Sequence, residues 1–291
     1  MKPKDILLHL RLPFSLFLMP IFWLAISQQS QGVFEMNLWI FVILHLLIYP
    51  SSNAYNSYFD KDEGSIGGLK NPPKVDKQLW HTANFLDALG ILLSIFFVHI
   101  SFAALILLYV LVSRMYSHPG IRIKKMPILS WFIVGLFQGA LVYKMVWVFG
   151  QNLELGSFLK TQNIAGSPIW IGAVFSALIL WAVYPITQVY QHEEDAKNGD
   201  QTLSILLGIR GTFIFTMLVF SLAVGCAYLF LVYHHFTTFI ILSAPIAVFM
   251  NWWFFKVLKD EKQANFTYTM LLNASASLLL NVCFIYNSFY K

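Results

Sequence analysis

Charge is scarce in this chain. Lys, Arg, Asp and Glu make up 11% of its 291 residues, whereas 58% are hydrophobic and 17% are aromatic. Because soluble globular proteins carry roughly a quarter charged residues, this chain could not cover a soluble fold of its length. The same composition excludes a disordered chain and a coiled coil. It predicts an integral membrane protein that crosses the bilayer several times.

Cysteine is also scarce, with only Cys226 and Cys283, and both lie inside apolar runs. Two such residues exclude a disulfide scaffold and favour neither a metal site nor a disulfide. The sequence also contains no Gly-rich nucleotide loop and no His/Cys spacing of the kind that binds zinc.

Long apolar runs are abundant. A membrane-spanning helix needs about 20 mostly apolar residues, and the sequence predicts an all-α bundle of about nine such helices around a central cavity. The first run follows basic residues, as in a signal peptide, but we expect it to be retained. The predicted spans are 12–30, 37–59, 82–99, 101–116, 127–149, 168–191, 212–233, 236–257 and 267–289.

The distribution of basic residues predicts the orientation. With the N-terminus in the cytoplasm, all of the 19 Lys and Arg residues except Lys144, Lys160 and Lys291 fall on the cytoplasmic side, as the positive-inside rule requires. The net charge of +5 is therefore a topology signal, and we expect neither a nucleic-acid partner nor an obligate protein partner. Because no organellar transit peptide precedes the first span, we expect a bacterial inner membrane.

Two polar strings repeat at the cytoplasmic ends of spans two and six. Residues 53–64 and 188–199 both read amide-x-Tyr-amide-x-x-x-Asp-x-x-x-Gly. This repeat predicts two related halves that face one cavity. On a helix, offsets of three and seven residues return to one face. The pattern therefore predicts one polar edge through Asn53, Asn56 and Asp60, extended by Glu63, and a second edge through Gln188, Gln191 and Asp195.

Such edges are costly against lipid, so we expect them to line a wet interior. Carboxylate and amide oxygens suit Mg²⁺, which is commonly shared between one or two carboxylates and substrate phosphates. The alternative is a hydrogen-bonded seam between helices. In the loop after span four, Arg122 and Lys124 are candidates for binding phosphate oxygens, and Lys70 is a third candidate. Asp87, inside span three, is an intramembrane carboxylate without an obvious partner.

Over essentially its whole length, the chain resembles the UbiA superfamily of intramembrane prenyltransferases. Asn56 and Asp60 match the first motif of that family, Asn-Asp-x-x-Asp-x-x-x-Asp. The second motif of the family is matched by Asp195, Gly199, Thr202, Leu203 and Gly208. The family's loop after span four is matched by Tyr116, Ser117, Pro119, Arg122 and Lys124. The chain departs from the first motif at Ser57 and Gly64, where the family has Asp. In the second string, Gln191 replaces the leading Asp of the motif, and Gln188 stands at a position that is often Asn in the family.

The resemblance implies Mg²⁺-dependent transfer of a prenyl group from an allylic polyprenyl diphosphate to a lipophilic, often aromatic, acceptor in the bilayer. It implies one domain over residues 1–291, with loops 60–81, 114–127 and 191–211 as a cap over the site. The expected catalytic residues are Asp60, Asp195, Arg122 and Lys124. The expected diphosphate ligands are Asn53, Lys70, Tyr116, Ser117, Arg122, Lys124 and Gln188, and the expected metal ligands are Asn56, Asp60, Glu63, Gln191, Glu194 and Asp195.

Two other readings stay open at this point. A transporter or lipid-binding protein would use the same polar edges without chemistry, although it leaves the string from Asp195 to Gly208 unexplained. A cyclase or a degenerate homologue would ionise or bind the prenyl diphosphate without an external acceptor. Release of diphosphate by the purified protein separates the transporter from the enzymes.

Overall fold

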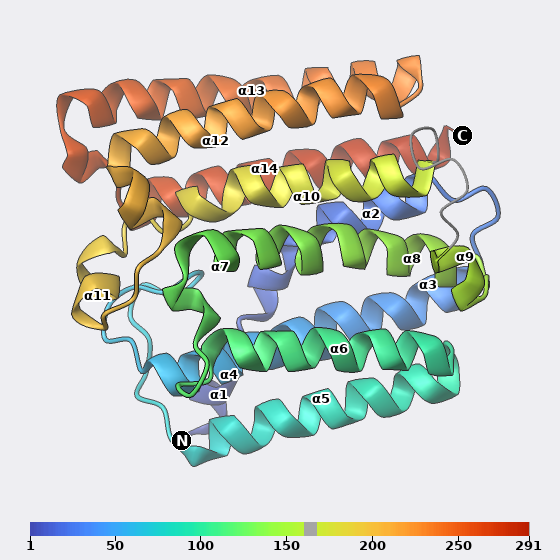
Figure 1. The fold of residues 1–291 in the computed structure, drawn as a ribbon, viewed down its shortest axis with the longest axis horizontal. Coiled ribbons are helices and arrows are strands. Elements are labelled where there is room, and N and C mark those ends of the chain that lie inside the picture. Colours follow the sequence, from blue (N-terminus) through green and yellow to red (C-terminus); the bar gives the residue numbers. More distant parts are fainter. Residues whose placement is uncertain (160–167, 291) are drawn as a thin grey trace. The chain divides into compact units, whose positions relative to one another are not determined.

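A computed structural model describes residues 1–159 and 168–290, and these residues confirm the all-α prediction. Besides helices, they contain one isolated bridge between Ile66 and Leu69. The helical elements, of which Figure 1 labels the α-helices, are α1 Pro3–Leu10, η1 Leu12–Phe17, α2 Met19–Ser27, α3 Phe34–Phe41, η2 Val42–Ile48, α4 Tyr49–Asp60, α5 Lys77–Phe97, α6 Ile100–Ser117, η3 Ile123–Lys125, α7 Pro127–Val134, η4 Gly135–Leu141, α8 Val142–Phe149, α9 Leu155–Leu159, α10 Pro168–Ile186, α11 His192–Lys197, α12 Leu203–Phe230, α13 Tyr233–Lys259, η5 Glu261–Gln263 and α14 Phe266–Phe289.

Within the described residues, nine helical segments are long and apolar enough to cross a membrane, as the sequence predicts. The ends differ in places. The first segment starts at Pro3 rather than at residue 12, and it is interrupted at Arg11, whose φ of 48° ends α1. The third starts at Lys77, because the Asp76 side chain accepts a hydrogen bond from the backbone N–H of Gln78 and caps α5. Lys160 and Lys291 lie outside the described residues.

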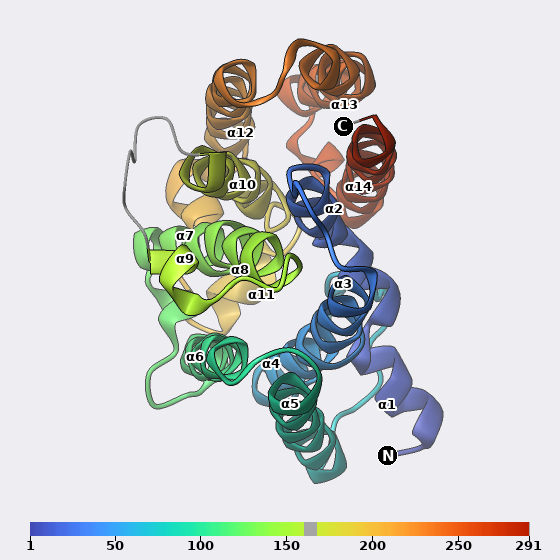
Figure 2. The ribbon, with the colours of Figure 1, turned by 90° about the vertical axis from the view of Figure 1, so that its right-hand side faces the viewer.

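The chain divides into two compact units. Unit 1 comprises Met1–Leu16, Gln29–Lys124 and Met145–Lys160, and unit 2 comprises Phe17–Gln28, Lys125–Lys144 and Thr161–Lys291. In unit 1, helices α4, α5 and α6 pack against one another (Figures 1 and 2), and α1 lies against α4. Helix α4 continues the π-helical segment η2, and Pro50 stands in its first turn. Helix α4, packed against α5 and α6, therefore carries residues 53–60 of the first polar string.

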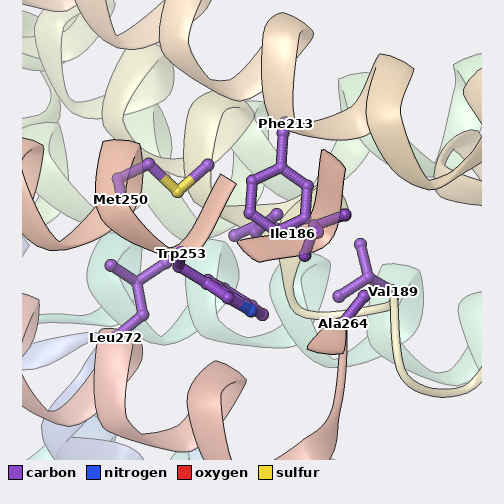
Figure 3. Packing of buried hydrophobic residues seen from close by; sticks show 8 residues of the cluster. Ile186, Val189, Phe213, Met250, Trp253, Ala264 and Leu272 are labelled. Atoms are coloured by element: carbon purple, nitrogen blue, oxygen red, sulfur yellow. The ribbon is translucent and has the colours of Figure 1, made fainter. Parts of the chain in front are cut away.

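In unit 2, helix α10 packs against α12 and η4, and α14 packs against α2 and α13. Gly139 of η4 is needed for close helix packing, because a Cβ there would lie 2.7 Å from the backbone oxygen of Ser176 on α10. Trp253 of α13 is fully buried at the centre of an apolar cluster (Figure 3), 4.7 Å from the Phe213 ring between centroids. Ile186, the last residue of α10, and Val189, in the turn that follows, belong to the same cluster.

Candidate functional site

The first polar edge forms as predicted. Asn53, Asn56 and Asp60 all belong to the continuous helix α4. The predicted extension to Glu63 along the same helix is wrong, because α4 ends at Asp60 and Lys61 turns into the left-handed region with φ 54°. Glu63 therefore lies in the loop that follows, where its side chain is exposed.

Asp60 is the centre of a charged cluster in unit 1. Its side chain is 3% exposed, and its Oδ1 lies 2.8 Å from Lys124 Nζ and 3.5 Å from an Arg122 guanidinium nitrogen. Its Oδ2 accepts a hydrogen bond of 2.7 Å from Asn56 Nδ2. Arg and Lys side chains are groups that bind phosphate oxygens in proteins, and the cluster places one of each beside the Asp60 carboxylate.

The loop after α6 folds back onto α4. Asn56 Nδ2 lies 3.1 Å from the Ser117 hydroxyl at the end of α6. The chain then reverses, with Arg122 in the left-handed region (φ 49°) and its backbone N–H bonded to the His118 carbonyl at 2.7 Å. This turn and the short helix η3 deliver Lys124 to Asp60. The structure thus brings together Asn56, Asp60, Ser117, Arg122 and Lys124, all of which the sequence singles out.

Three other predicted residues of unit 1 are placed differently. Asn53 Nδ2 donates to the Leu10 carbonyl at 3.3 Å, so its amide contacts the end of α1. Lys70 is exposed in the loop after the first motif, and its carbonyl accepts a hydrogen bond from Ser65. Tyr116 is half-buried in the last turn of α6.

The second polar edge is not one helix, and this prediction is wrong. Helix α10 ends at Ile186, and a separate helix α11 begins at His192, so Gln188 and Gln191 lie in the turn between them. Val189, in this turn, is buried in the apolar cluster of unit 2, which fixes the turn against α12 and α13. The Thr187 hydroxyl also bonds back to the Tyr184 carbonyl at 2.6 Å, an alternative to helical bonding.

Gln188 is buried in this turn, with 8% of its surface exposed. Its Oε1 has no hydrogen-bond partner in the part of the chain that the structure describes. A buried carbonyl oxygen without a donor is costly. The Gln188 Oε1 atom can therefore accept a hydrogen bond from a group outside the described residues.

Helix α11 carries the acids of the second motif. Glu193, Glu194 and Asp195 occupy its first turn, where negative charge is favourable. His192 Nε2 lies 2.7 Å from Ser204 Oγ on α12, and burial lowers the pKa of the His192 imidazole, so the ring is neutral at pH 7. The helix is followed by Gly199, whose φ of 65° explains why the motif has glycine there.

The donor set of the two strings consists of oxygens, which suit Mg²⁺. Among residues 1–159 and 168–290, no group of three or more His, Cys, Asp and Glu side chains is arranged to hold a metal ion.

Sequence reasoning missed the partner of Asp87. In unit 1, Asp87 of α5 forms an ion pair with Arg114 of α6, and its Oδ1 lies 2.6 Å from the Ser51 hydroxyl on α4. The signal was present, because Arg114 is the only charged residue in the predicted span 101–116. The signal is easily missed, because Arg114 also fits the positive-inside rule as one of the basic residues on the cytoplasmic side.

Solved structures resemble this chain over nearly its whole length. A UbiA homologue from Archaeoglobus fulgidus bound to GPP and Mg²⁺ matches with a TM-score of 0.68 and 17% identity, over 98% of each chain. A digeranylgeranylglyceryl phosphate synthase matches with a TM-score of 0.59 and 20% identity, over 99% of each chain. A homologue from Aeropyrum pernix K1 matches with a TM-score of 0.67 and 14% identity, over 94% of this chain and 98% of that chain.

These likenesses show that the fold is that of UbiA homologues. No curated protein matches the sequence. The model of the UbiA prenyltransferase family matches residues 17–275, which include both polar strings and the basic loop. The chain therefore belongs to the UbiA prenyltransferase family, a family of transferases, and is a multi-pass integral membrane protein.

Proposed function

We propose that this protein transfers a prenyl group from an allylic polyprenyl diphosphate to a lipophilic, aromatic acceptor within the membrane. Family membership supports the reaction class. Two solved structures of a UbiA homologue from Archaeoglobus fulgidus hold GPP or DMAPP together with Mg²⁺, which supports the donor class and the metal.

The observation that carries the proposal is the cluster around Asp60, where Lys124 and Arg122 converge on a buried carboxylate. In the transfer, the carbon–oxygen bond to the diphosphate breaks and its electron pair stays on the departing oxygen. The allylic cation is then attacked by the acceptor, which loses a proton. Lys124 and Arg122 would stabilise the negative charge that develops on the leaving group.

Mg²⁺ would add charge neutralisation of the diphosphate. We assign its ligands to the oxygen-bearing side chains of the two strings: Asn56, Asp60, Glu63, Gln191, Glu194 and Asp195. The repeated motif predicts that Asp60 and Asp195 both serve the same reaction. The few acids in the donor set fit the preference of Mg²⁺ for water and phosphate oxygens as its remaining ligands.

The remaining assigned residues would bind the diphosphate or its hydration shell: Asn53, Lys70, Tyr116, Ser117 and Gln188. The Ser117 hydroxyl is already placed beside Asn56 at 3.1 Å. The buried Gln188 Oε1 would accept a hydrogen bond from water. We also propose that the N-terminus and these loops face the cytoplasm, on the basis of the positive-inside rule.

The test is release of diphosphate and formation of a prenylated lipid by purified protein in vesicles, with radiolabelled GPP and an aromatic acceptor. We expect both products with Mg²⁺ and neither with a chelator. Asp60→Ala and Asp195→Ala should each abolish turnover, whereas Asp62→Ala, two positions from Asp60, serves as the matched control and should remain active. Full activity in both alanine variants would overturn the site, and GPP binding without diphosphate release would favour a transporter or lipid-binding protein.

A further inference from the structure

An ion pair lies inside the membrane-spanning part of unit 1. Asp87 is the eleventh residue of α5, and Arg114 is the fourth from the end of α6. The exposed fractions of their side chains are 9% and 14%. Because polar groups within a span are costly, an intramembrane ion pair calls for a functional explanation.

The pair is tied to α4 by two side chains. Ser51 Oγ lies 2.6 Å from Asp87 Oδ1 and accepts a hydrogen bond of 3.0 Å from the Arg114 guanidinium. The guanidinium carbon also stands 3.8 Å from the centre of the Tyr55 ring, a cation–π contact. Ser51 and Tyr55 are one helical turn apart, so the pair holds one face of α4.

The charged cluster lies further along the same helix. Asp60 is nine residues from Ser51, about 13.5 Å along the axis and about 180° around it, so holding the Ser51 face of α4 also sets the direction in which Asp60 points. Above Arg114, α6 carries Ser117, which contacts Asn56, and the chain continues to Lys124. The ion pair therefore joins the same two helices whose ends bring Asp60 and Lys124 together.

A buried ion pair stabilises a fold little compared with apolar side chains of similar volume, and its best-supported use is to specify one arrangement. Here the arrangement would be the rotation and the height of α4 relative to α6. A shift of one residue along either helix would move its side chains by about 1.5 Å along the axis. That is enough to break the contact between Asp60 Oδ1 and Lys124 Nζ, which are 2.8 Å apart.

We propose that Asp87 and Arg114 are positioning residues of the diphosphate site: through Ser51 and Tyr55 they fix α4 so that Asp60 meets Lys124 and Arg122. They do not touch the substrate. The inference rests on the proposed function, because it assigns the cluster around Asp60 to a diphosphate.

The test separates positioning from stability. Asp87→Asn and Arg114→Gln each leave one buried charge without its partner, and both should lower the thermal midpoint in detergent. The paired variant Asp87→Leu with Arg114→Met removes both charges and should restore the midpoint. It should nevertheless bind GPP about tenfold more weakly and show about a 100-fold lower kcat/KM, because α4 is no longer aligned. The KM for the acceptor should not change.

Two further variants keep the test decisive if the paired variant does not fold. Ser51→Ala removes only the hydroxyl that joins α4 to the pair, and we expect about fivefold weaker GPP binding with an unchanged acceptor KM. Ser52→Ala is the matched control: its hydroxyl bonds Ser113 between the same helices at 2.9 Å, without a charge, and GPP binding should change less than twofold.

GPP binding equal to that of the wild type in the paired variant, or in Ser51→Ala, would overturn the inference and leave the proposed function intact. A wild-type protein that binds neither GPP nor inorganic diphosphate would overturn the proposed function, and the inference with it.

Discussion

The two polar strings have nearly the same sequence pattern but different local structures. Both follow a Tyr-Pro pair, Tyr49-Pro50 in one unit and Tyr184-Pro185 in the other. After Pro50 the chain stays helical to Asp60, whereas after Pro185 the helix ends within one residue and restarts at His192. A shared proline therefore does not decide the outcome.

The neighbours of each string decide it. Along α4, Ser51, Ser52 and Asn56 bond to side chains of α5 and α6, which hold the segment helical. After Pro185, Ile186, Thr187 and Val189 are β-branched and have lower helix propensity. Ile186 and Val189 are buried beside Trp253 instead. The same motif is thus presented on a rigid helix in unit 1 and on a turn and a short helix in unit 2.

The largest expected effect tests whether both strings serve the reaction. If both strings serve the reaction, Asp60→Asn and Asp195→Asn should each lower kcat by about 100- to 1000-fold, because each removes a carboxylate proposed to bind the Mg²⁺ that neutralises the leaving diphosphate. Asp60→Asn should also lower the thermal midpoint, since the buried Asp60 carboxylate lies 2.8 Å from Lys124 Nζ and 3.5 Å from the Arg122 guanidinium. Steady-state kinetics and melting curves in detergent measure both. Wild-type kcat in Asp195→Asn beside a large loss in Asp60→Asn would restrict the reaction to the first string.

The next effect concerns the acids that the family has and this chain lacks. Ser57→Asp should destabilise unit 1 by about 2 kcal/mol, because position 57 is 3% exposed and the Ser57 hydroxyl has no partner within the described residues. Gln191→Asp should cost less than about 0.5 kcal/mol, since position 191 is half-exposed at the start of α11. Thermal unfolding followed by intrinsic fluorescence compares the two. If the Ser57→Asp variant is as stable as the wild type, the difference in burial between positions 57 and 191 does not govern which string tolerates an added acid.

The smallest effect compares the two amides. Asn56→Ala removes a side chain that bonds both Asp60 and Ser117, and should lower stability by about 1 kcal/mol. Gln188→Leu removes a buried oxygen that has no partner within the described residues, and should leave stability unchanged or raise it. Denaturation midpoints of the two variants in one detergent give the difference. A greater loss of stability in Gln188→Leu than in Asn56→Ala would contradict this comparison of the two amides.

Much of the fold follows from the sequence, because apolar runs of membrane length report directly on the spans. Their number is confirmed, and so is the helical edge through Asn53, Asn56 and Asp60. The break after Ile186 could not be read from a helical repeat, since it depends on the packing of Val189 against residues distant in the sequence. The charge of Arg114 inside a span is visible in the sequence, but its pairing with Asp87, 27 residues earlier on another helix, is seen only in the structure.

The most direct test of the central claim is the affinity for GPP of the double variant Lys124→Met with Arg122→Met, measured beside geraniol, which has the same chain without phosphates. If the cations at Asp60 hold the diphosphate, the double variant should lose GPP affinity by at least about 100-fold, at 1.5–3 kcal/mol for each charged contact. Its affinity for geraniol should stay within about twofold of the wild type. Unchanged GPP affinity would contradict the assignment of this cluster to the diphosphate.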